Sequence, residues 1–321
     1  MELPPKLRLT IDEALDGVPI SELSAASDAL SQRYRNEVRD GRMHLSEDGA
    51  ALAYLATRMP ATFAAIHASL SETAIAVPGF APVSLLDAGA GPGTALWAAA
   101  TCWPGLERAD MLEASPVIRS WGERLSKGAG VGEVAWRAHD LRRPLTAKPS
   151  DLVVLAYVLD ELTQADRGPL IDRLWSLTAG VLVIVEPGTP AGWARILDAR
   201  ARLITAGARI AAPCPHARTC PIVGPDWCHF SARVARSRTH RLAKSAEVPW
   251  EDEKYIYLAA TRLPAERPGA RVIAPPEAAS GRVRLKLCQA DGAAAHRLVT
   301  RREGEVFKRA RRIGWGDGFE P

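Results

Sequence analysis

The stretch Val83-Ser84-Leu85-Leu86-Asp87-Ala88-Gly89-Ala90-Gly91-Pro92-Gly93 decides the fold of this 321-residue chain. The apolar residues before Asp87 are typical of a central parallel strand, and Asp87 stands where that strand ends. Gly89, Gly91 and Gly93 let the backbone turn tightly and lie close to a ligand, since a side chain at any of them would narrow that approach. We therefore predict a strand, a glycine turn and then a helix over residues 94–100.

Two acids that follow narrow the choice of ligand. Glu113 ends the next apolar strand, twenty positions past Gly93, where a carboxylate can accept hydrogen bonds from ribose hydroxyls. Asp140, in the run Ala138-His139-Asp140-Leu141, ends a third strand, from which its side chain can reach an adenine edge. The whole pattern resembles the class I S-adenosylmethionine-dependent methyltransferases. It fits them better than the nicotinamide dehydrogenases, which share the glycine fingerprint.

Short apolar runs alternate with helical stretches from Val83 to about Leu263, which predicts an α/β fold with a doubly wound parallel sheet. The expected strands cover residues 83–87, 109–113, 133–137, 151–157, 181–186 and 254–260. The helices between them begin near Gly93, Pro116, Asp166 and Ala191. Ligands of such sheets lie beyond the carboxyl ends of the strands, where we expect these side chains to converge: Asp87, Glu113, Asp140, Tyr157 and Glu186. The predicted cofactor site comprises Asp87, Gly89, Gly91, Gly93, Glu113, Asp140 and Tyr157.

Composition divides the chain into three parts. Residues 1–80 show helical periodicity, with one helix expected over residues 19–39 and another from Ser46 that Pro60 interrupts. Residues 81–265 form the expected S-adenosylmethionine-binding domain, with a cysteine-rich insertion at residues 207–250. A proline-rich linker leads into residues 266–321, which we expect to be a small basic β module with strands over 282–288 and 297–300.

Charge is distributed unevenly along the chain. The formal net charge is +4, yet residues 233–321 hold 19 basic against 11 acidic side chains, and the rest of the chain holds 22 against 26. A basic C-terminal part suits a polyanion such as RNA, because each neutralised phosphate releases counterions; a solvated surface without a partner explains it equally well. No stretch of sequence resembles a membrane span, a signal peptide or a transit helix, so we expect a cytoplasmic protein without a membrane partner.

Two further features admit both a structural and a functional interpretation. Asp160 and Glu161 follow the expected strand 151–157 and can form a catalytic pair, but acids at such positions more often start or cap the next helix. Trp315 lies close to the basic run at residues 308–312. It either stacks on RNA or anchors the C-terminal tail in a core.

The cysteines form the second informative group. Cys214, Cys220 and Cys228 lie within fifteen residues, and Cys288 ends a predicted strand sixty residues later. In a cytoplasmic chain such clustering favours metal or cluster ligation over disulfides. Zinc accepts such ligands, but its usual sites place paired cysteines about two to four residues apart, whereas an iron–sulfur cluster tolerates looser spacing. Spacing alone leaves both open, and Cys102 fits packing inside a helix.

Several runs of the chain resemble the mitochondrial small-ribosomal-subunit methyltransferase-like family, which has bacterial relatives: Cys214-Pro215-His216, Cys220-Pro221, Asp226-Trp227-Cys228-His229-Phe230, Pro249-Trp250-Glu251-Asp252-Glu253-Lys254-Tyr255 and Trp315-Gly316-Asp317. The resemblance covers most of the chain. It implies that four cysteines hold a [4Fe–4S] cluster, with zinc as the alternative metal: Cys214, Cys220, Cys228 and Cys288. It also implies that the partners are the small ribosomal subunit and its rRNA.

Together these features predict an S-adenosylmethionine-dependent, methyltransferase-like protein that acts on the small ribosomal subunit or its rRNA. No catalytic residue is assigned, because residues 155–158 lack the Asn-Pro-Pro-Tyr element of base N-methylases and the clustered thiols are committed to a metal. Two alternatives stay open at this point. One is a non-catalytic ribosome assembly factor that retains the cofactor pocket, and the other is a zinc-stabilised small-molecule methyltransferase, which would have no affinity for RNA.

Overall fold

The computed structural model describes residues 1–35 and 45–320 of the chain. Within these residues, four helices precede the first strand: α1 (Pro5–Ala14), α2 (Ile20–Arg35), α3 (Asp48–Thr57) and α4 (Met59–Ala76). The last part of the helix predicted over residues 19–39 lies outside the described residues. Pro60 stands in the first turn of α4 and separates it from α3, as the sequence predicts, because a proline there costs no intrahelical hydrogen bond.

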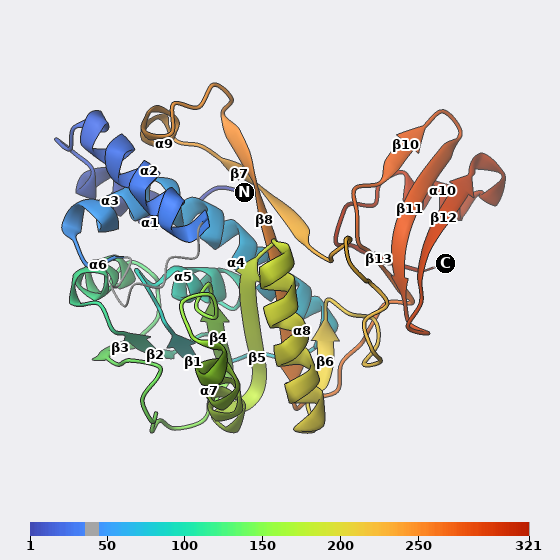
Figure 1. The fold of residues 1–321 in the computed structure, drawn as a ribbon, viewed down its shortest axis with the longest axis horizontal. Helices are drawn as coiled ribbons and strands as arrows, with labels where there is room; N and C mark the ends of the chain where they lie inside the picture. The colour runs from blue at the N-terminus through green and yellow to red at the C-terminus, as the bar shows by residue number, and fades with distance from the viewer. Residues whose placement is uncertain (36–44, 321) are drawn as a thin grey trace.

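A mixed eight-stranded sheet forms the centre of the molecule (Figure 1). Its strands are β1 (Ser84–Ala88), β2 (Arg108–Glu113), β3 (Glu133–Ala138), β4 (Ser150–Ala156), β5 (Thr178–Pro187), β6 (Arg209–Ala212), β7 (Phe230–Ala235) and β8 (Trp250–Thr261). They lie in the order β3-β2-β1-β4-β5-β8-β6, with β7 paired to the other end of β8. The first five strands are parallel, which confirms the α/β prediction.

The late strands depart from the expected all-parallel sheet. β8 runs antiparallel to β5, and β6 and β7 run antiparallel to β8. Antiparallel neighbours need no crossover helix. The chain between α8 and β8 therefore contains the strands β6 and β7, irregular segments and only one short helix, α9 (Arg238–Ala243). The region 207–250 therefore contributes two strands to the main sheet, and three of its cysteines lie in the irregular run 213–229.

Helices cover both faces of the sheet (Figure 1). α7 (Gln164–Ser176) and α8 (Pro190–Thr205) pack against each other and against β5, while α4 packs against α5 (Thr94–Cys102) and against β5 and β8. The sixth helix, α6 (Pro116–Ser126), lies beside β2 and β3. None of the helices within the described ranges is long and apolar enough to cross a membrane.

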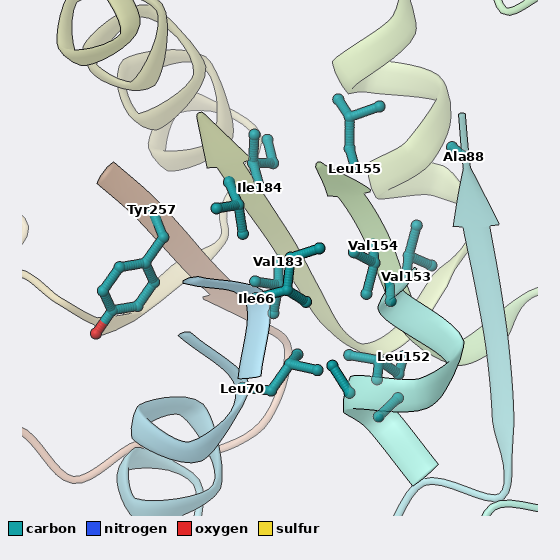
Figure 2. Packing of buried hydrophobic residues seen from close by; sticks show 14 of the residues in the cluster. Ile66, Leu70, Ala88, Leu152, Val153, Val154, Leu155, Val183, Ile184 and Tyr257 are labelled. Carbon is teal, nitrogen blue, oxygen red and sulfur yellow. The ribbon is translucent and has the colours of Figure 1, made fainter. Parts of the chain in front are cut away.

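The main core lies between α4 and the sheet. Figure 2 shows Ile66 and Leu70 of α4 against Leu152 and Val183 of the central strands, and all four side chains are at most 2 % exposed. Strands buried on both faces need apolar residues in unbroken runs, which is why β4 and β5 were readable from the sequence. Burying each such side chain stabilises the fold by about 1.5–3 kcal/mol.

The C-terminal part forms a second sheet with its own small core. It contains β9 (Ala270–Val272), β10 (Glu277–Ala279), β11 (Arg282–Gln289), β12 (Ala294–Thr300) and β13 (Gly318–Phe319), with a 3₁₀ turn at Arg301–Glu303 and the helix α10 (Glu305–Ala310). Alternate residues of β11 point inward and pack with Val299 and Phe307. Both predicted strands of this module are present, although the domain boundaries stay a prediction.

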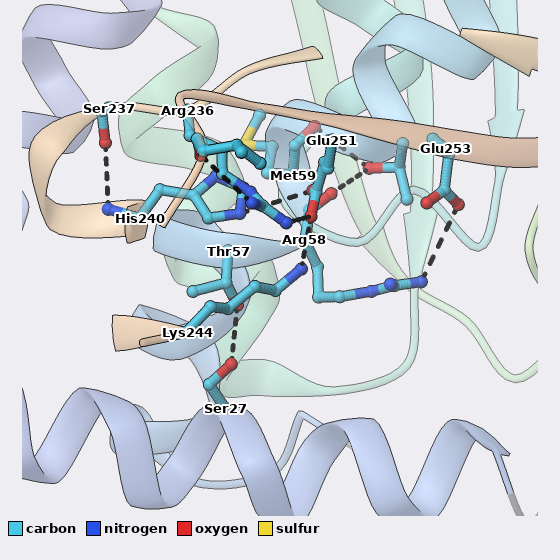
Figure 3. Close-up of polar contacts among 12 residues, drawn as sticks. Ser27, Thr57, Arg58, Met59, Arg236, Ser237, His240, Lys244, Glu251 and Glu253 are labelled. Carbon is cyan, nitrogen blue, oxygen red and sulfur yellow. Dashed lines mark hydrogen bonds and ion pairs between the residues drawn. The ribbon is translucent and has the colours of Figure 1, made fainter. Parts of the chain in front are cut away.

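A buried polar cluster holds together the hairpin formed by β7, α9 and β8 (Figure 3). The helix α9 of this hairpin contacts α2 and α3. The carboxylate of Glu251 on β8 accepts hydrogen bonds from Arg236 and Lys244, each at 3.0 Å. The Nε2 atom of His240, which is fully buried, lies 3.4 Å from the same carboxylate. Burial alone would raise the pKa of Glu251, but the His240 and Lys244 contacts outweigh it and hold this pKa below its usual value.

Replacing Glu251 with glutamine should lower the free energy of unfolding by about 2 kcal/mol at pH 7, because three cationic or polar partners lose their anion. The folded-state pKa of Glu251 lies below its unfolded value, so its contribution is present above about pH 4.5 and disappears as the pH falls through the folded-state pKa. Urea unfolding of both proteins at pH 7 and pH 4 measures this. Glu277→Gln, on the exposed edge strand β10, is the control; equal effects of the two substitutions would contradict the assignment.

Candidate functional site

The glycine loop leaves β1 and enters α5 as the sequence predicts. The amides of Gly89 and Ala90 both donate to the carbonyl of Leu112 at 2.9 Å, which ties the loop to β2. Gly89 has φ +76°, and a Cβ there would lie 2.5 Å from Val158, so only glycine fits. Gly91 also has positive φ, but a Cβ there would meet nothing within 4 Å. The backbone at Gly91 therefore faces open space that a ligand can approach.

Glu113 is bound to this loop from the end of β2. Its Oε2 accepts the amide of Gly91 at 2.9 Å, and its Oε1 accepts the amide of Ser115 at 2.8 Å. Burial raises the pKa of Glu113, and the two amide hydrogen bonds oppose that rise. The carboxylate is thus held beside the open face of Gly91, where the hydroxyls of a ribose would be expected.

Asp87 is the most deeply buried acid of the predicted cofactor site, with 2 % of its surface exposed. Its Oδ2 atom has no hydrogen-bond partner in the described chain. Burial, and then the charge of Glu113, raise the pKa of Asp87 to about 8. A buried carboxyl with an unused oxygen calls for a donor or a cation from outside the chain. This fits a cationic cofactor such as S-adenosylmethionine.

Further carboxylates gather at the same end of the sheet. Glu186, at the end of β5, is fully buried, accepts the amide of Leu159 at 3.0 Å and pairs with Arg195 at 2.6 Å. Glu161 is exposed to solvent at this end of the sheet, where the charges of Asp160, Glu113 and Glu186 raise its pKa. Asp87, Glu113 and Glu186 thus stand at the carboxyl ends of β1, β2 and β5, where the sequence predicts them.

The interpretation of Asp160 and Glu161 as helix-capping acids is wrong. α7 begins at Gln164, and the N-cap position is occupied by Thr163. Asp160 is instead buried in the turn after β4, close enough to Glu186 to raise the pKa of that residue. The sequence did not show this, because β4 ends at Ala156 and α7 begins only at Gln164, so the two acids lie between the strand and the helix.

The other two predicted site residues make different contacts. β3 ends at Ala138, so Asp140 lies in the following loop and not at a strand end. Its carboxylate accepts from the backbone amide and the guanidinium of Arg142, which hold the pKa of Asp140 below its usual value. Tyr157 directly follows β4, and its hydroxyl donates to Glu253 at 3.2 Å. The role of each residue in cofactor binding stays a prediction.

Tyr157 belongs to a group that sequence reasoning missed. Its φ of +60° is a backbone outlier for a bulky residue, and such conformations cluster at functional sites. Its partner Glu253 on β8 lies 4.0 Å from Arg58, which connects α3 to α4. Burial, followed by the Glu253 charge, raises the pKa of the Tyr157 hydroxyl well above its usual value. No sequence signal joins three segments so far apart.

A second site lies between α8 and the C-terminal sheet. Its pocket is lined by all four cysteines predicted as metal ligands: Cys214, Cys220, Cys228 and Cys288. The thiols come from the irregular run after β6 and from the end of β11, segments brought together because β11 pairs with β9 beside this run. Apolar side chains of Trp193, Ile222 and Ile273 form the walls. We call this the thiol pocket.

The electrostatics of the thiol pocket suit a cationic guest. Burial, and then the charges of the other three cysteines, raise the pKa of Cys228 well above its usual value. Burial, followed by Cys214 and Cys220, raises the pKa of Cys288 to about 12. Because the thiolates disfavour one another, they ionise together only if a cation compensates them. All five cysteines of the chain are free thiols.

The thiol pocket contains four possible metal ligands, but their side chains are not arranged in a coordination geometry. Across residues 1–35 and 45–320, no three His, Cys, Asp or Glu side chains are arranged to hold a metal ion. Four thiols around one apolar-walled pocket nevertheless supply the ligands that both zinc and iron–sulfur clusters use. Cys102 is separate from this set, because it lies at the end of α5 against Ser71.

Trp315 anchors the C-terminal tail. Its half-buried ring packs against the main core, 4.8 Å from the ring of His229 and 4.3 Å from the ammonium group of Lys254. Of the two interpretations offered by the sequence, the packing role agrees with the structure.

The strand order, the glycine loop and the acids at the strand ends define a class I methyltransferase-like α/β fold. The chain belongs to the family described as mitochondrial small ribosomal subunit Rsm22, whose family model matches residues 48–320. The family resemblance predicted from the cysteine runs is thereby confirmed.

Known relatives of the chain include a human and a fission-yeast protein. The chain is 30% identical over 319 residues to the ribosome assembly protein METTL17, mitochondrial, of Homo sapiens. The matched region covers 92% of this chain and 69% of the human protein. It is 25% identical over 335 residues to the Rsm22-cox11 tandem protein 2, mitochondrial, of Schizosaccharomyces pombe, and spans 44% of its length. Among solved structures, an O-methyltransferase family protein from Burkholderia thailandensis is similar at 15% identity, with a TM-score of 0.47 over 77% of this chain and 72% of that one.

Proposed function

We propose that this protein binds S-adenosylmethionine at the glycine loop and acts, as a methyltransferase-like protein, on the small ribosomal subunit or its rRNA. The observation that carries the cofactor is the pairing of Gly91 and Glu113, since the amide and the carboxylate frame an open face of the loop. The buried, partner-free Oδ2 of Asp87 supports a cationic ligand there. The ribosomal target is supported by family membership and by the human relative, a ribosome assembly protein.

Methyl transfer can be tested directly. The cofactor supplies an electrophilic methyl group, and the chain has to bind it and position an acceptor. Incubating the protein with labelled S-adenosylmethionine and immature small subunits should label the rRNA, and an Asp87→Ala variant should fail to do so. Absence of label despite measurable cofactor binding would exclude methyl transfer to the rRNA, and the protein would then bind the cofactor without catalysis.

One observation favours a second function, a non-catalytic assembly factor that retains the cofactor pocket. The end of β4, where an acceptor would be expected, is engaged internally, because Tyr157 donates to Glu253 and Glu253 lies 4.0 Å from Arg58. This contact links the strand end to the helices that precede β1. In this function cofactor binding would stabilise one arrangement of these elements without methyl transfer.

We also propose that the thiol pocket holds a [4Fe–4S] cluster through Cys214, Cys220, Cys228 and Cys288, with zinc as the alternative. The support is the donor set: four buried or half-buried thiols line one pocket, and burial together with the neighbouring thiols raises the pKa of Cys228 and Cys288. Protein purified without oxygen should be brown and contain iron and sulfide. A colourless protein that contains zinc would contradict the cluster assignment and support zinc as the bound metal. The cytoplasmic location expected from the sequence stays a prediction.

The basic C-terminal sheet is the proposed RNA-binding surface. Arg311 and Arg312 are exposed in the turn after α10, where they can reach phosphates. A double Arg311→Gln/Arg312→Gln variant should bind a small-subunit rRNA transcript more weakly and lower the slope of log affinity against log salt by about 1.5. An Arg8→Gln/Arg202→Gln variant removes the same charge from exposed positions elsewhere and is the control. Equal salt slopes for the two variants would show that Arg311 and Arg312 do not contact the RNA.

A further inference from the structure

Arg200 carries a buried positive charge for which the described chain supplies no carboxylate. It lies on α8 with 5 % of its surface exposed, and among residues 1–35 and 45–320 no carboxylate lies within 4.0 Å of its guanidinium nitrogens. The other two buried arginines nearby are compensated, because Arg195 pairs with Glu186 and Arg271 pairs with Glu72. Burying an uncompensated cation is costly, so its retention requires an anion.

The side chain of Arg200 is fixed in one orientation by the chain around it. One terminal nitrogen donates to the backbone carbonyls of His216 and Arg218, each at 2.8 Å. Its Nε atom is buried and has no hydrogen-bond partner. These contacts hold the loop that carries Cys214 and Cys220, and they leave one donor unused at the edge of the thiol pocket.

The thiol pocket contains the groups that can provide the missing anion. Arg200 lines it together with the four cysteines. A guanidinium on the wall of this pocket attracts thiolates, because the two charges are opposite.

We propose that Arg200 is the counter-charge of an anionic metal–thiolate group in the thiol pocket and a positioning residue for its ligands. The inference rests on the proposed metal site. Four thiolates around a divalent core leave a net charge of roughly −2, which Arg200 partly neutralises, and its free Nε–H is the donor available to a ligand sulfur. The same chemistry applies to a [4Fe–4S] cluster and to zinc.

The test compares Arg200→Gln, Arg200→Lys and Arg202→Gln, all purified without oxygen. Arg202 lies on the same helix but is exposed and paired with Asp172. We expect Arg200→Gln to release its metal to a chelator about tenfold faster than the wild type or more, with Arg200→Lys in between and Arg202→Gln unchanged. If the metal is a cluster, its reduction potential should fall in Arg200→Gln, since the reduced form carries one more negative charge.

A further measurement separates this role from ordinary packing. Thermal unfolding of the metal-loaded and the metal-free proteins should show a larger loss for Arg200→Gln in the loaded form, whereas a purely structural arginine would cost the same in both. Equal losses, with wild-type release rates, would overturn the proposal while leaving the metal site intact. A wild-type protein without bound metal would overturn both. If Arg200→Gln does not fold, Arg200→Lys decides: a folded lysine variant that loses metal as fast as Cys228→Ser would overturn the role of the charge.

Discussion

Replacing Cys228 with serine should empty the thiol pocket. We expect protein purified without oxygen to fall from about four iron atoms per chain to fewer than one and to lose its brown colour, because a cluster of this type uses four thiolates. The melting temperature should drop by about 10 °C, since a metal that binds only the folded chain stabilises it. Cys228 is the best choice among the four, because its pKa is raised by all three of the others.

The matched control for this substitution is Cys102→Ser. Cys102 is also half-buried, but it lies at the end of α5 against Ser71 and takes no part in the thiol pocket. Its variant should keep full iron content and nearly the wild-type melting temperature. Iron analysis and visible absorption of both variants measure the outcome. Equal metal content in the Cys228→Ser variant and the wild type would show that the pocket does not hold the metal.

Replacing Glu113 with alanine should weaken binding of S-adenosylmethionine about 100-fold. The carboxylate is expected to accept two charge-assisted hydrogen bonds from the ribose, each contributing about 1.5–3 kcal/mol, and the loss of both exceeds the 2.8 kcal/mol that a factor of 100 represents. Part of the effect comes from the loop, because Glu113 also accepts the amide of Gly91. Isothermal titration calorimetry of the wild type and the variant measures the two affinities.

Two further variants sharpen this experiment. Glu113→Gln keeps an acceptor oxygen but loses the charge, so its affinity should fall between those of the wild type and the alanine variant. Glu123→Ala removes an exposed carboxylate from α6 and should change nothing. If Glu113→Ala binds the cofactor within about threefold of the wild type, the cofactor does not lie against the loop as proposed.

The central strands could be predicted because burial on both faces demands unbroken apolar runs. β1, β2 and β4 appear within one residue of the expected positions for this reason. The direction of β8 could not be predicted, since the same apolar run fits a parallel or an antiparallel neighbour. The glycine loop was readable for a different reason: Gly89 and Gly91 adopt positive φ angles that other residues rarely take.

The residues of the candidate sites likewise include some that could be predicted from the sequence and some that could not. Asp87 and Glu113 were predictable because each stands at the end of an apolar strand, and parallel strands end at one edge of the sheet. The contact of Tyr157 with Glu253 was not, because 96 residues separate them and only the antiparallel pairing of β8 with β5 brings them together. Arg200 gave no signal either, since one arginine on an amphipathic helix usually faces solvent.

The central claim is that this protein acts on the small ribosomal subunit. The most direct test is sedimentation of the tagged, full-length protein in lysates of the cells that make it, prepared without oxygen. We expect it to migrate with incomplete small subunits and to be absent from complete ribosomes, and the Arg311→Gln/Arg312→Gln variant should show weaker association. A protein that stays at the top of the gradient, free of small-subunit particles and rRNA, would contradict the account.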